Sequence, residues 1–265
     1  MRQWLRKIRR AILNQDPSFC DMHEDVAARG AADEYLGHIR KCLRERFDGR
    51  KHLRILDAGC QAGRLLIPLA EDGHQLIGVD ASGFSLRRAA QHVKERGLSV
   101  RLHRGNIANL RQWVSPASLD VVICTEVLYL CRDYEGILSL LVQSLKPGGM
   151  LCISHRPAAY YAAVALEHGA DAQAADIVRR SDGPSKDGDY HNWQTEPQLR
   201  ALYERAGCSV LACAPINPQE RTINFSDVMD DIVRRLLRPF HENKTVRVPS
   251  YLLIIAQRAS WASSA

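Results

Sequence analysis

The chain has 265 residues, of which 46% are hydrophobic, so it can bury a full core as one large domain or as one domain with insertions. No stretch approaches eighteen uninterrupted apolar residues, and we therefore predict no membrane span. The net charge is +6, but five of the 36 bases and no acid fall in residues 1–15, which leaves 31 bases against 30 acids elsewhere. Such a nearly neutral body does not indicate the basic groove expected of a nucleic-acid enzyme.

The eight cysteines are scattered through the chain, and none of them forms a C-x-x-C pair. This usage predicts reduced thiols in a cytoplasmic protein and argues against a zinc site, so no metal is expected. The basic start is not followed by an apolar run, and we expect no signal peptide.

Residues 1–52 are predicted to form an N-terminal helical extension. In residues 1–15, apolar side chains share one helical stripe beside the bases. This arm could contact a membrane surface, a partner or nucleic acid, or it could dock on the domain with its basic face in solvent. Residues 16–52 repeat apolar side chains at helical intervals around Tyr35. The second helix could close over a ligand through Tyr35 or simply pack.

Residues 54–80 predict the unit around which the rest of the chain is organised. An apolar run ending at Leu56 is typical of a buried parallel strand. Helical spacing follows from Leu65 to Ala70, and a second strand runs from Leu76 to Val79. The segment is therefore predicted to be a strand, a glycine turn, a helix and a strand.

The turn after the first strand contains Gly59 and Gly63, so that a ligand can approach the backbone closely. The second strand ends on Asp80, where a carboxylate is well placed to accept hydrogen bonds from ribose hydroxyls. The dinucleotide fingerprint G-x-G-x-x-G is not met, because Gln61 and Arg64 stand where its second and third glycines should be. The pattern predicts a nucleoside ligand, and a packing turn with an exposed aspartate is the alternative.

The segment D-A-G-C-x-A-G-R, from Asp57 to Arg64, resembles the first motif of class I S-adenosylmethionine-dependent methyltransferases. The resemblance covers most of residues 53–155 and is specific at the family level. It implies that S-adenosylmethionine is the cofactor and S-adenosylhomocysteine the product. The chain departs from the pattern at Gln61, where the family usually has glycine. A side chain there costs about 1 kcal/mol if the backbone is left-handed, and it could intrude on the cofactor.

After Asp80, the chain predicts a helix over Phe84–Gly97 and a third strand over Ser99–His103. This strand leads to Asn106, at a place where the resembled family usually has an acid against the adenine. The amide of Asn106 offers both an acceptor and a donor, so it can pair with the adenine amino group. A turn asparagine without a ligand is the alternative.

A central strand is predicted over Leu119–Thr125, which is continuously apolar and rich in β-branched residues. In open α/β sheets, ligands bind outside the carboxyl ends of the strands. Thr125, Glu126 and Tyr129 are therefore expected where the methyl group meets its acceptor. The segment that begins at Glu126 resembles that of many small-molecule methyltransferases. The chain lacks the D/N-P-P-Y/F tetrapeptide of enzymes that methylate base amines and the Pro-Cys pair of cytosine-5 enzymes.

A helix over Asp133–Leu145 is predicted to end at residues 146–149, Lys-Pro-Gly-Gly, which turn the chain into a strand over Met150–Ser154. The motif L-K-P-G-G-x-L also recurs in the resembled family. His155 follows this strand, and a lone histidine at a strand end could be structural or catalytic.

Two insertions are predicted in the second half of the chain. Residues 156–193 carry tyrosines, histidines and a tryptophan, and their polar middle, Arg179–Asp189, predicts a mobile loop. We expect the acceptor pocket and its lid in this insertion. Residues 217–248 contain a helix begun by Ser226, whose apolar stripe could be core, a homodimer contact through residues 225–240, or a substrate wall. The stripe consists of Phe225, Val228, Met229, Ile232, Val233, Leu236 and Leu237.

Between the insertions, Glu196–Gly207 predicts a helix and Ser209–Ala214 a strand, and Tyr251–Gln257 is the last strand. The resemblance then implies an α/β, Rossmann-like fold with a seven-stranded, mostly parallel sheet of order 3-2-1-4-5-7-6 and helices on both faces. The methyltransferase domain would span residues 53–258, followed by a flexible tail over residues 259–265.

The resemblance and the strand ends together define three sets of site residues. The cofactor is expected to contact Tyr35, Asp57, Gly59, Cys60, Gln61, Gly63, Asp80, Ala81, Asn106, Ile107, Thr125 and Glu126. The acceptor is expected to contact Tyr129, Tyr160, Tyr161 and Trp193. The general base is expected to be His155, Glu126 or His191, in that order of preference.

The predicted function is direct methyl transfer from S-adenosylmethionine to an oxygen or nitrogen of a small-molecule acceptor. The protein would supply proximity and, for a hydroxyl or a protonated amine, a base. Two alternatives stay open: a cofactor-binding scaffold that has lost catalysis through Gln61, and an RNA methyltransferase anchored by residues 1–15. Oxygen, nitrogen and carbon acceptors share this scaffold, so the acceptor is not set by the fold.

Overall fold

The structure is a computed structural model that describes residues 26–184, 188–223, 231–242 and 245–260. The basic arm of residues 1–15, the helix start predicted at Ser226 and residues 261–265 of the predicted tail lie outside the described residues.

The helices and strands follow one another as expected for an α/β chain. In chain order they are α3 (Val26–Phe47), β1 (Arg54–Ala58), α4 (Leu66–Glu71), β2 (Gln75–Asp80), α5 (Gly83–Glu95), β3 (Val100–Arg104), η1 (Ile107–Gln112), β4 (Leu119–Cys124), η2 (Leu128–Leu130), α6 (Tyr134–Ser144), β5 (Leu145–His155), α7 (Ala158–Glu167), α8 (Asp171–Arg179), β6 (Asp182–Pro184), β7 (Tyr190–Asn192), α9 (Glu196–Arg205), β8 (Cys208–Thr222), α10 (Asp231–Leu237), η3 (Arg238–Phe240), β9 (His241–Glu242) and β10 (Thr245–Arg258).

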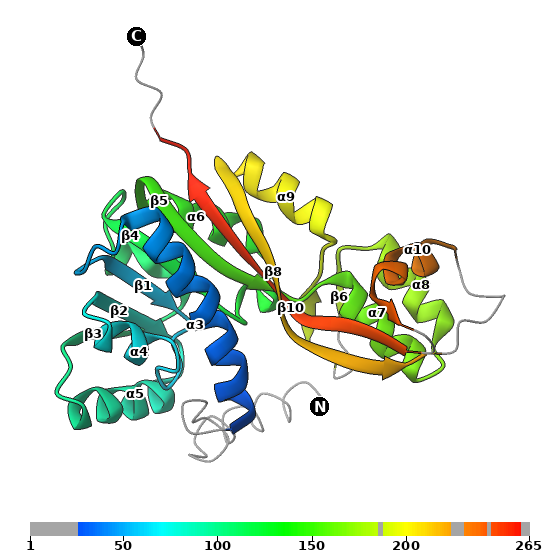
Figure 1. Cartoon of the computed structure of the whole chain (residues 1–265), viewed down its shortest axis with the longest axis horizontal. Helices are drawn as coiled ribbons and strands as arrows, with labels where there is room; N and C mark the ends of the chain where they lie inside the picture. The colour runs from blue at the N-terminus through cyan, green and yellow to red at the C-terminus, as the bar shows by residue number, and fades with distance from the viewer. Residues whose placement is uncertain (1–25, 185–187, 224–230, 243–244, 261–265) are drawn as a thin grey trace, which may run out of the picture. The chain divides into compact units, whose positions relative to one another are not determined.

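The main sheet has the strand order β3-β2-β1-β4-β5-β10-β8, with the short β9 paired to β10 (Figure 1). Strand β1 runs parallel to both β2 and β4, and β2 runs parallel to β3. With β8 and β10 as the sixth and seventh strands of the family sheet, this order is 3-2-1-4-5-7-6. The predicted fold class is therefore confirmed.

The chain forms two compact units. The first contains the described residues up to Cys124, the segment Leu140–Cys152 and the described residues from Arg258 onward. The second contains Thr125–Ser139 and Ile153–Gln257. The boundaries predicted at residues 53, 156, 193, 217 and 248 follow sequence patterns rather than compactness and stay predictions.

The core of the first unit is built on β1, β2 and β4, which are largely buried, whereas β3 is partly exposed. All six residues of β4 are buried, as the continuously apolar pattern predicted. Helix α4 packs on β2, and α5 packs on β2 and β3. Gly78 of β2 makes this packing possible, because a Cβ there would lie 2.7 Å from Leu66 Cδ1. The register pairs Asp80 with Arg104, so the segments that follow β2 and β3 both leave the sheet at the carboxyl ends of these parallel strands.

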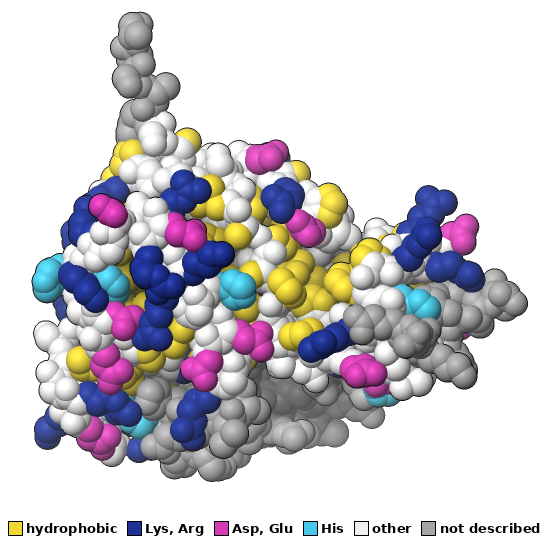
Figure 2. Space-filling model, in the orientation of Figure 1, with side chains coloured by type: hydrophobic (Ala, Val, Ile, Leu, Met, Phe, Trp, Pro, Cys, Tyr) yellow, Lys and Arg dark blue, Asp and Glu magenta, His cyan; other side chains and the backbone are white. Residues whose placement is uncertain are grey.

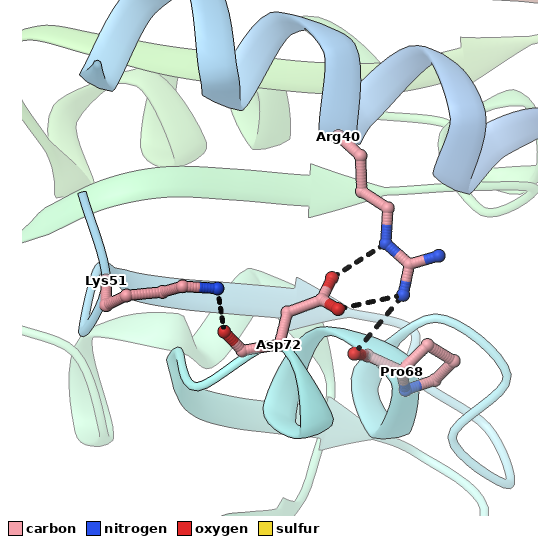
Figure 3. Close-up of polar contacts among 4 residues, drawn as sticks. All are labelled: Arg40, Lys51, Pro68 and Asp72. Atoms are coloured by element: carbon pink, nitrogen blue, oxygen red, sulfur yellow. Dashed lines mark hydrogen bonds and ion pairs between the residues drawn. The ribbon is translucent and has the colours of Figure 1, made fainter. Parts of the chain in front are cut away.

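Helix α3 is attached to α4 by one polar cluster, shown in Figure 3. The guanidinium of Arg40 donates to both carboxylate oxygens of Asp72, at 2.7 and 3.1 Å, and to the carbonyl of Pro68 at 3.5 Å. The Lys51 ammonium donates to the Asp72 carbonyl at 2.9 Å. Buried Leu36, Ile39 and Leu43 of α3 confirm the predicted helical repeat. The cluster fixes the position of α3 within the first unit.

The second unit has its own core, built by α7, α8 and α10 together with parts of β8 and β10. Val246 and Val248 are fully buried in this core, so β10 begins at Thr245 rather than at the predicted Tyr251. Strand β8 likewise continues to Thr222 beyond the predicted end at Ala214. The predicted strands were too short because a second core supports their continuation.

Two further details of the second unit correct the sequence prediction. In α10, Val233 and Leu237 are buried one turn apart, whereas Ile232 is 47% exposed and does not belong to the buried stripe. Part of the segment predicted as a loop is ordered, because β6 pairs antiparallel with β7 from Asp182 opposite Asn192 to Pro184 opposite Tyr190. The hairpin ladder supplies backbone hydrogen bonds that the polar sequence did not indicate.

Strand β5 also begins earlier than predicted. It starts at Leu145 and includes the residues expected to form a turn before Met150. Gly148 has a φ of +76°, which favours glycine, and a Cβ at Gly149 would lie 2.9 Å from the Lys146 carbonyl. The two glycines are therefore needed by the backbone of the strand.

No helix in the described ranges is long and apolar enough to cross a membrane.

Candidate functional site

The loop after β1 is held against the end of β2. The Gly59 and Cys60 amides both donate to the carbonyl of Val79, at 2.7 and 3.2 Å. Gly59 and Gly63 have φ angles of +85° and +96°, and a Cβ at Gly63 would lie 2.8 Å from Ile67 Cδ1. Both positions therefore favour glycine, and the close approach of a ligand to this turn stays a prediction.

Gln61 adopts the left-handed conformation that the resembled motif fills with glycine. Its φ is +46°, and its amide donates to Oδ2 of Asp80 at 2.9 Å. Its side-chain Oε1 turns back on the loop and accepts from the Ala62 amide at 3.0 Å. The strain of about 1 kcal/mol for a non-glycine residue is thus offset by a local hydrogen bond.

Asp80 organises the loop as well as ending β2. Its two carboxylate oxygens accept from the amides of Gln61, at 2.9 Å, and Ser82, at 2.7 Å. Burial raises the pKa of Asp80, and the two amide donors act in the opposite direction. Each carboxylate oxygen can accept more than one hydrogen bond, so Asp80 can hold the loop and still accept from a ribose hydroxyl.

Asp57 lies beneath the same loop and is 2% exposed. Burial raises its pKa to about 7, the nearby Arg64 opposes this shift and the charge of Asp80 adds to it. Two neighbouring carboxylates whose ionisation is disfavoured by burial make a site that a cationic ligand would stabilise. The ammonium and sulfonium of S-adenosylmethionine fit this electrostatic pattern.

The remaining predicted cofactor residues of the first unit differ in exposure. The Gly105 amide donates to the Asp80 carbonyl at 2.9 Å, which brings the segment after β3 to the end of β2. Asn106 is exposed there, and its Oδ1 caps η1 by accepting from the Ala108 amide at 2.9 Å. Its side-chain amide can still donate, so a role toward adenine stays a prediction. Ile107 is buried beside it.

Tyr35 and Ala81 complete the predicted cofactor set in this unit. Tyr35 of α3 is fully buried, and the Arg64 guanidinium lies 5.7 Å from the centre of its ring. This contact makes Tyr35 part of the packing between α3 and the segment that leads from the glycine loop into α4. Ala81 is exposed directly after Asp80. Whether either residue contacts a cofactor stays a prediction.

Thr125 and Glu126 follow β4 and belong to the second unit. Thr125 is buried, while Glu126 is half-buried in a left-handed conformation with a φ of +60°. The Glu126 amide donates to Oγ of Ser154 at 2.7 Å, which holds this conformation. A non-glycine residue kept at positive φ by its surroundings is a frequent property of functional sites.

His155, the first choice as general base, is enclosed in the second unit. It is 0% exposed, and its Nε2 lies 2.8 Å from the hydroxyl of Tyr203. Nδ1 is buried and has no hydrogen-bond partner among the described residues. Burial lowers the pKa of His155 to about 3, so the ring is neutral and a weak base near pH 7. This environment favours a structural role.

The predicted acceptor residues converge on one cavity of about 560 Å³ in the second unit. Its lining consists of Arg156, Tyr160, Tyr161, Val164, Ala165, His168, Gln173, Ile177, Pro184, Asp189, His191 and Trp193. The size is that of a small-molecule pocket. Three of the four residues predicted to bind the acceptor therefore line the same space, together with His191, one of the predicted bases.

Hydrogen bonds and ring contacts fix the walls of this cavity. The Tyr161 hydroxyl lies 2.7 Å from Nδ1 of His191, and the Tyr161 ring packs 5.0 Å from the ring of Trp193. Trp193 is anchored from behind, because its Nε1 donates to the Ile177 carbonyl at 2.8 Å. Tyr129, the fourth predicted acceptor residue, contacts His191 edge to face at 5.3 Å.

Sequence reasoning did not name as site residues eight of the twelve lining residues, Arg156 among them, nor Tyr251, which contacts Arg156. The Arg156 guanidinium lies 4.6 to 4.8 Å from the ring centres of Tyr129, Tyr160 and Tyr251, and it donates to the Tyr251 hydroxyl. A signal was present for Arg156, because it directly follows the strand end at His155. Tyr251 gave none, since its pattern is that of a core residue in the last strand.

The described residues contain no group of three or more His, Cys, Asp or Glu side chains that could hold a metal ion.

Known protein sequences resemble this chain over about half of its length. Residues 50–192 match a protein family described as a methyltransferase domain. A ubiquinone biosynthesis O-methyltransferase of Rickettsia felis is 30% identical over 141 residues, which cover 53% of this chain and 54% of that protein. The protein of the same name in Idiomarina loihiensis is 37% identical over 107 residues, covering 40% and 44%. The chain thus spans about half the length of the curated relatives it matches.

A solved structure agrees over a longer stretch. The crystal structure of magnesium protoporphyrin IX methyltransferase from Synechocystis with bound S-adenosylhomocysteine superposes with a TM-score of 0.58 at 16% identity. The superposition covers 89% of this chain and 88% of that one. At this identity the likeness concerns the fold, and it agrees with the strand order of the main sheet.

Proposed function

This chain belongs to the class I S-adenosylmethionine-dependent methyltransferases, and from that premise we propose that it methylates an oxygen or nitrogen of a small-molecule acceptor by direct displacement. The observation that carries the proposal is the loop Gly59–Gly63, held through the Gln61 amide by one carboxylate oxygen of Asp80 at the carboxyl end of the parallel strands. The aromatic cavity of the second unit supports a small acceptor rather than a macromolecule.

The residues of the first unit suit the cofactor chemically. Asp80 would accept from the ribose hydroxyls, and Asn106 and Ile107 would contact the adenine. Gly59 and Gly63 leave room for close approach, and Asp57 offers negative charge to the amino acid part. S-adenosylmethionine, when bound, supplies a methyl group on an activated sulfonium. The protein then has to align the acceptor with that methyl group and exclude water.

His191 is the base that the geometry supports best. Methylation of a hydroxyl forms an oxygen–carbon bond, breaks the sulfur–carbon bond and releases the hydroxyl proton. With Nδ1–H of His191 donating to the Tyr161 oxygen, Nε2 would take that proton, and Tyr161 would orient the ring. Glu126 is the second choice, since its charge acts on Tyr129 and Tyr251 beside the cavity. His155, which has no exposed surface, is the third.

Oxygen is the acceptor atom we favour. The curated relatives named above are O-methyltransferases by name, and a hydroxyl acceptor gives the His191–Tyr161 pair a proton to remove. Nitrogen remains an outcome of the experiment, because an amine that is already neutral needs no base before it attacks.

The proposal is tested first by calorimetric titration of the full chain with S-adenosylhomocysteine, S-adenosylmethionine and NAD. We expect micromolar binding of the first two, loss of that binding in Asp80→Ala, and no binding of NAD.

Once an acceptor is found, His191→Gln should lower kcat by about 10²- to 10⁴-fold while S-adenosylhomocysteine binds as before. The exposed His241→Gln is the matched control. Unchanged turnover in His191→Gln would transfer the role to Glu126.

Two other functions have specific observations behind them. Gln61 occupies the glycine position of the loop, so a chain that binds neither cofactor form would be a scaffold. The five bases of residues 1–15 could anchor RNA, which salt-dependent RNA binding lost on their deletion would reveal. On the face drawn in Figure 2, Lys and Arg side chains of the described residues are interspersed with Asp and Glu, which does not favour an RNA groove.

A further inference from the structure

Arg156 is a cation in the wall of the acceptor cavity, and its contacts are unusual for a partly buried charge. Its guanidinium carbon lies 4.8 Å from the ring centre of Tyr129, 4.7 Å from that of Tyr160 and 4.6 Å from that of Tyr251. The three tyrosines come from η2, α7 and β10, so the rings surround the guanidinium from different elements. Such contacts stabilise a cation but leave its charge in place.

No carboxylate forms a direct ion pair with Arg156, although Asp189 lines the same cavity and the charge of Glu126 acts on Tyr129 and Tyr251. Within the described ranges, no Asp or Glu oxygen lies within ion-pairing distance of this guanidinium, whose hydrogen bonds go to tyrosine hydroxyls. Its Nε–H is buried and has no acceptor among the described residues. This donor has almost no accessible surface, so a ligand would meet the part of the guanidinium that lines the cavity rather than Nε. An anionic ligand group would supply the negative charge in direct contact with this guanidinium that no described residue provides.

The rest of the cavity fits a flat, mainly apolar body attached to that anion. Tyr161 and Trp193 form one aromatic wall, and Val164, Ala165 and Ile177 contribute apolar surface. The guanidinium fork matches a carboxylate or phosphate in two hydrogen bonds, which fixes orientation as well as affinity. A cationic group in the same place would meet the charge of Arg156 and be repelled.

We propose that the acceptor is a ring compound bearing a carboxylate or phosphate, and that Arg156 binds this anionic group and thereby orients the acceptor in the cavity. The identification of this ligand as the methyl acceptor rests on the proposed function. The anion preference of the cavity itself is independent of methyl transfer. A merely structural role for Arg156, as a cation held between tyrosine rings, is the competing explanation.

The experiment compares ring probes of similar size and different charge. Binding of para-hydroxybenzoate, para-hydroxybenzamide, phenyl phosphate and para-(aminomethyl)phenol to the full chain, saturated with S-adenosylhomocysteine, is measured by calorimetry and by tryptophan fluorescence. We expect at least one of the two anions to bind about tenfold or more tightly than the amide and the amine to bind most weakly. Which anion is preferred distinguishes a carboxylate from a phosphate acceptor.

Variants separate recognition from packing. Arg156→Gln should abolish the preference for anion over amide while the affinity for the amide changes little, and Arg156→Lys should keep part of it, because it keeps the charge without the fork. The matched control is Arg132→Gln, since Arg132 also stacks on a tyrosine, Tyr190, at 4.5 Å but does not line the cavity. The control should retain the full preference.

Several results would overturn the inference. These are equal affinity of the wild-type chain for acid and amide, an anion preference that survives in Arg156→Gln, or no detectable binding of either anion at millimolar concentration. Where Arg156→Gln does not fold, the Lys variant and the loss of anion affinity with added salt provide the test. A chain that prefers anions but does not bind S-adenosylhomocysteine would refute the proposed methyl transfer and leave the anion site standing.

Discussion

Burial acts on two titratable residues, Asp57 and His155, by disfavouring the charged form of each. The pKa of Asp57 is raised to about 7 and that of His155 is lowered to about 3. Between about pH 4 and 7, folded Asp57 holds a proton that the unfolded chain has released, so this residue makes stability fall as pH rises. Between about pH 3 and 6.5, unfolded His155 binds a proton that the folded chain excludes, so this residue makes stability rise with pH.

Replacing His155 therefore has a defined consequence. The wild-type contribution is fully present above about pH 6.5 and is lost, at up to about 1.4 kcal/mol per pH unit, as the pH falls toward 3. In His155→Gln this contribution is absent, so urea unfolding at pH 7 and pH 5 should show about 2 kcal/mol less acid destabilisation than in the wild type. Turnover should stay within a few-fold. A hundredfold loss of turnover with intact cofactor binding would instead restore His155 as the base.

Gln61 combines backbone strain with a hydrogen bond that offsets it. Gln61→Ala keeps the φ of +46° but loses the bond from the Ala62 amide, and we expect it to be less stable than wild type by about 1 kcal/mol. Gln61→Gly loses the bond and the strain together, so it should unfold near the wild-type urea concentration and bind S-adenosylhomocysteine at least as tightly. Weaker binding by the Gly variant would mean that the Gln61 side chain helps to hold the cofactor.

At the scale of elements, α3 is held by its buried apolar residues and by the polar contacts of Arg40. Arg40 and Asp72 are each about one-third exposed, with side-chain exposures of 37% and 32%, so solvent weakens their ion pair. We expect Arg40→Ala to lower stability by about 1 kcal/mol and to speed amide exchange in α3 more than elsewhere. Arg44→Ala, one turn along the same helix and exposed, is the control. Equal exchange in both variants would show that the apolar face of α3 alone holds it.

The elements themselves were predicted with uneven success, for a physical reason. Strands β1, β2 and β4 and helix α5 follow local periodicity closely, because each buries its apolar face against its neighbours in the first unit. Strands β8 and β10 run beyond their predicted ends because residues such as Val246 pack in the core of the second unit. Nothing in the local pattern indicated that this core existed.

At the scale of the whole molecule, each compact unit contains a different part of the proposed site, although Thr125 and Glu126, two predicted cofactor residues, lie in the second. The first holds the predicted cofactor loop with Asp57 and Asp80, and the second holds the aromatic cavity with Arg156 and the His191–Tyr161 pair. Because the cofactor loop and the aromatic cavity lie in different units, the cofactor and acceptor experiments proposed above can fail separately. The near balance of bases and acids outside residues 1–15 agrees with a small-molecule acceptor.

The sequence by itself determined the family and the strand order that the family implies, and it predicted the cofactor loop, because Gly59, Gly63 and Asp80 lie close together within one strand–helix–strand unit. Only the tertiary structure decided which residues of the second unit meet. It enclosed His155 against Tyr203, paired His191 with Tyr161, and brought Tyr251 to Arg156 across 95 positions of sequence. Contacts of that separation arise from packing between elements, which local periodicity does not encode.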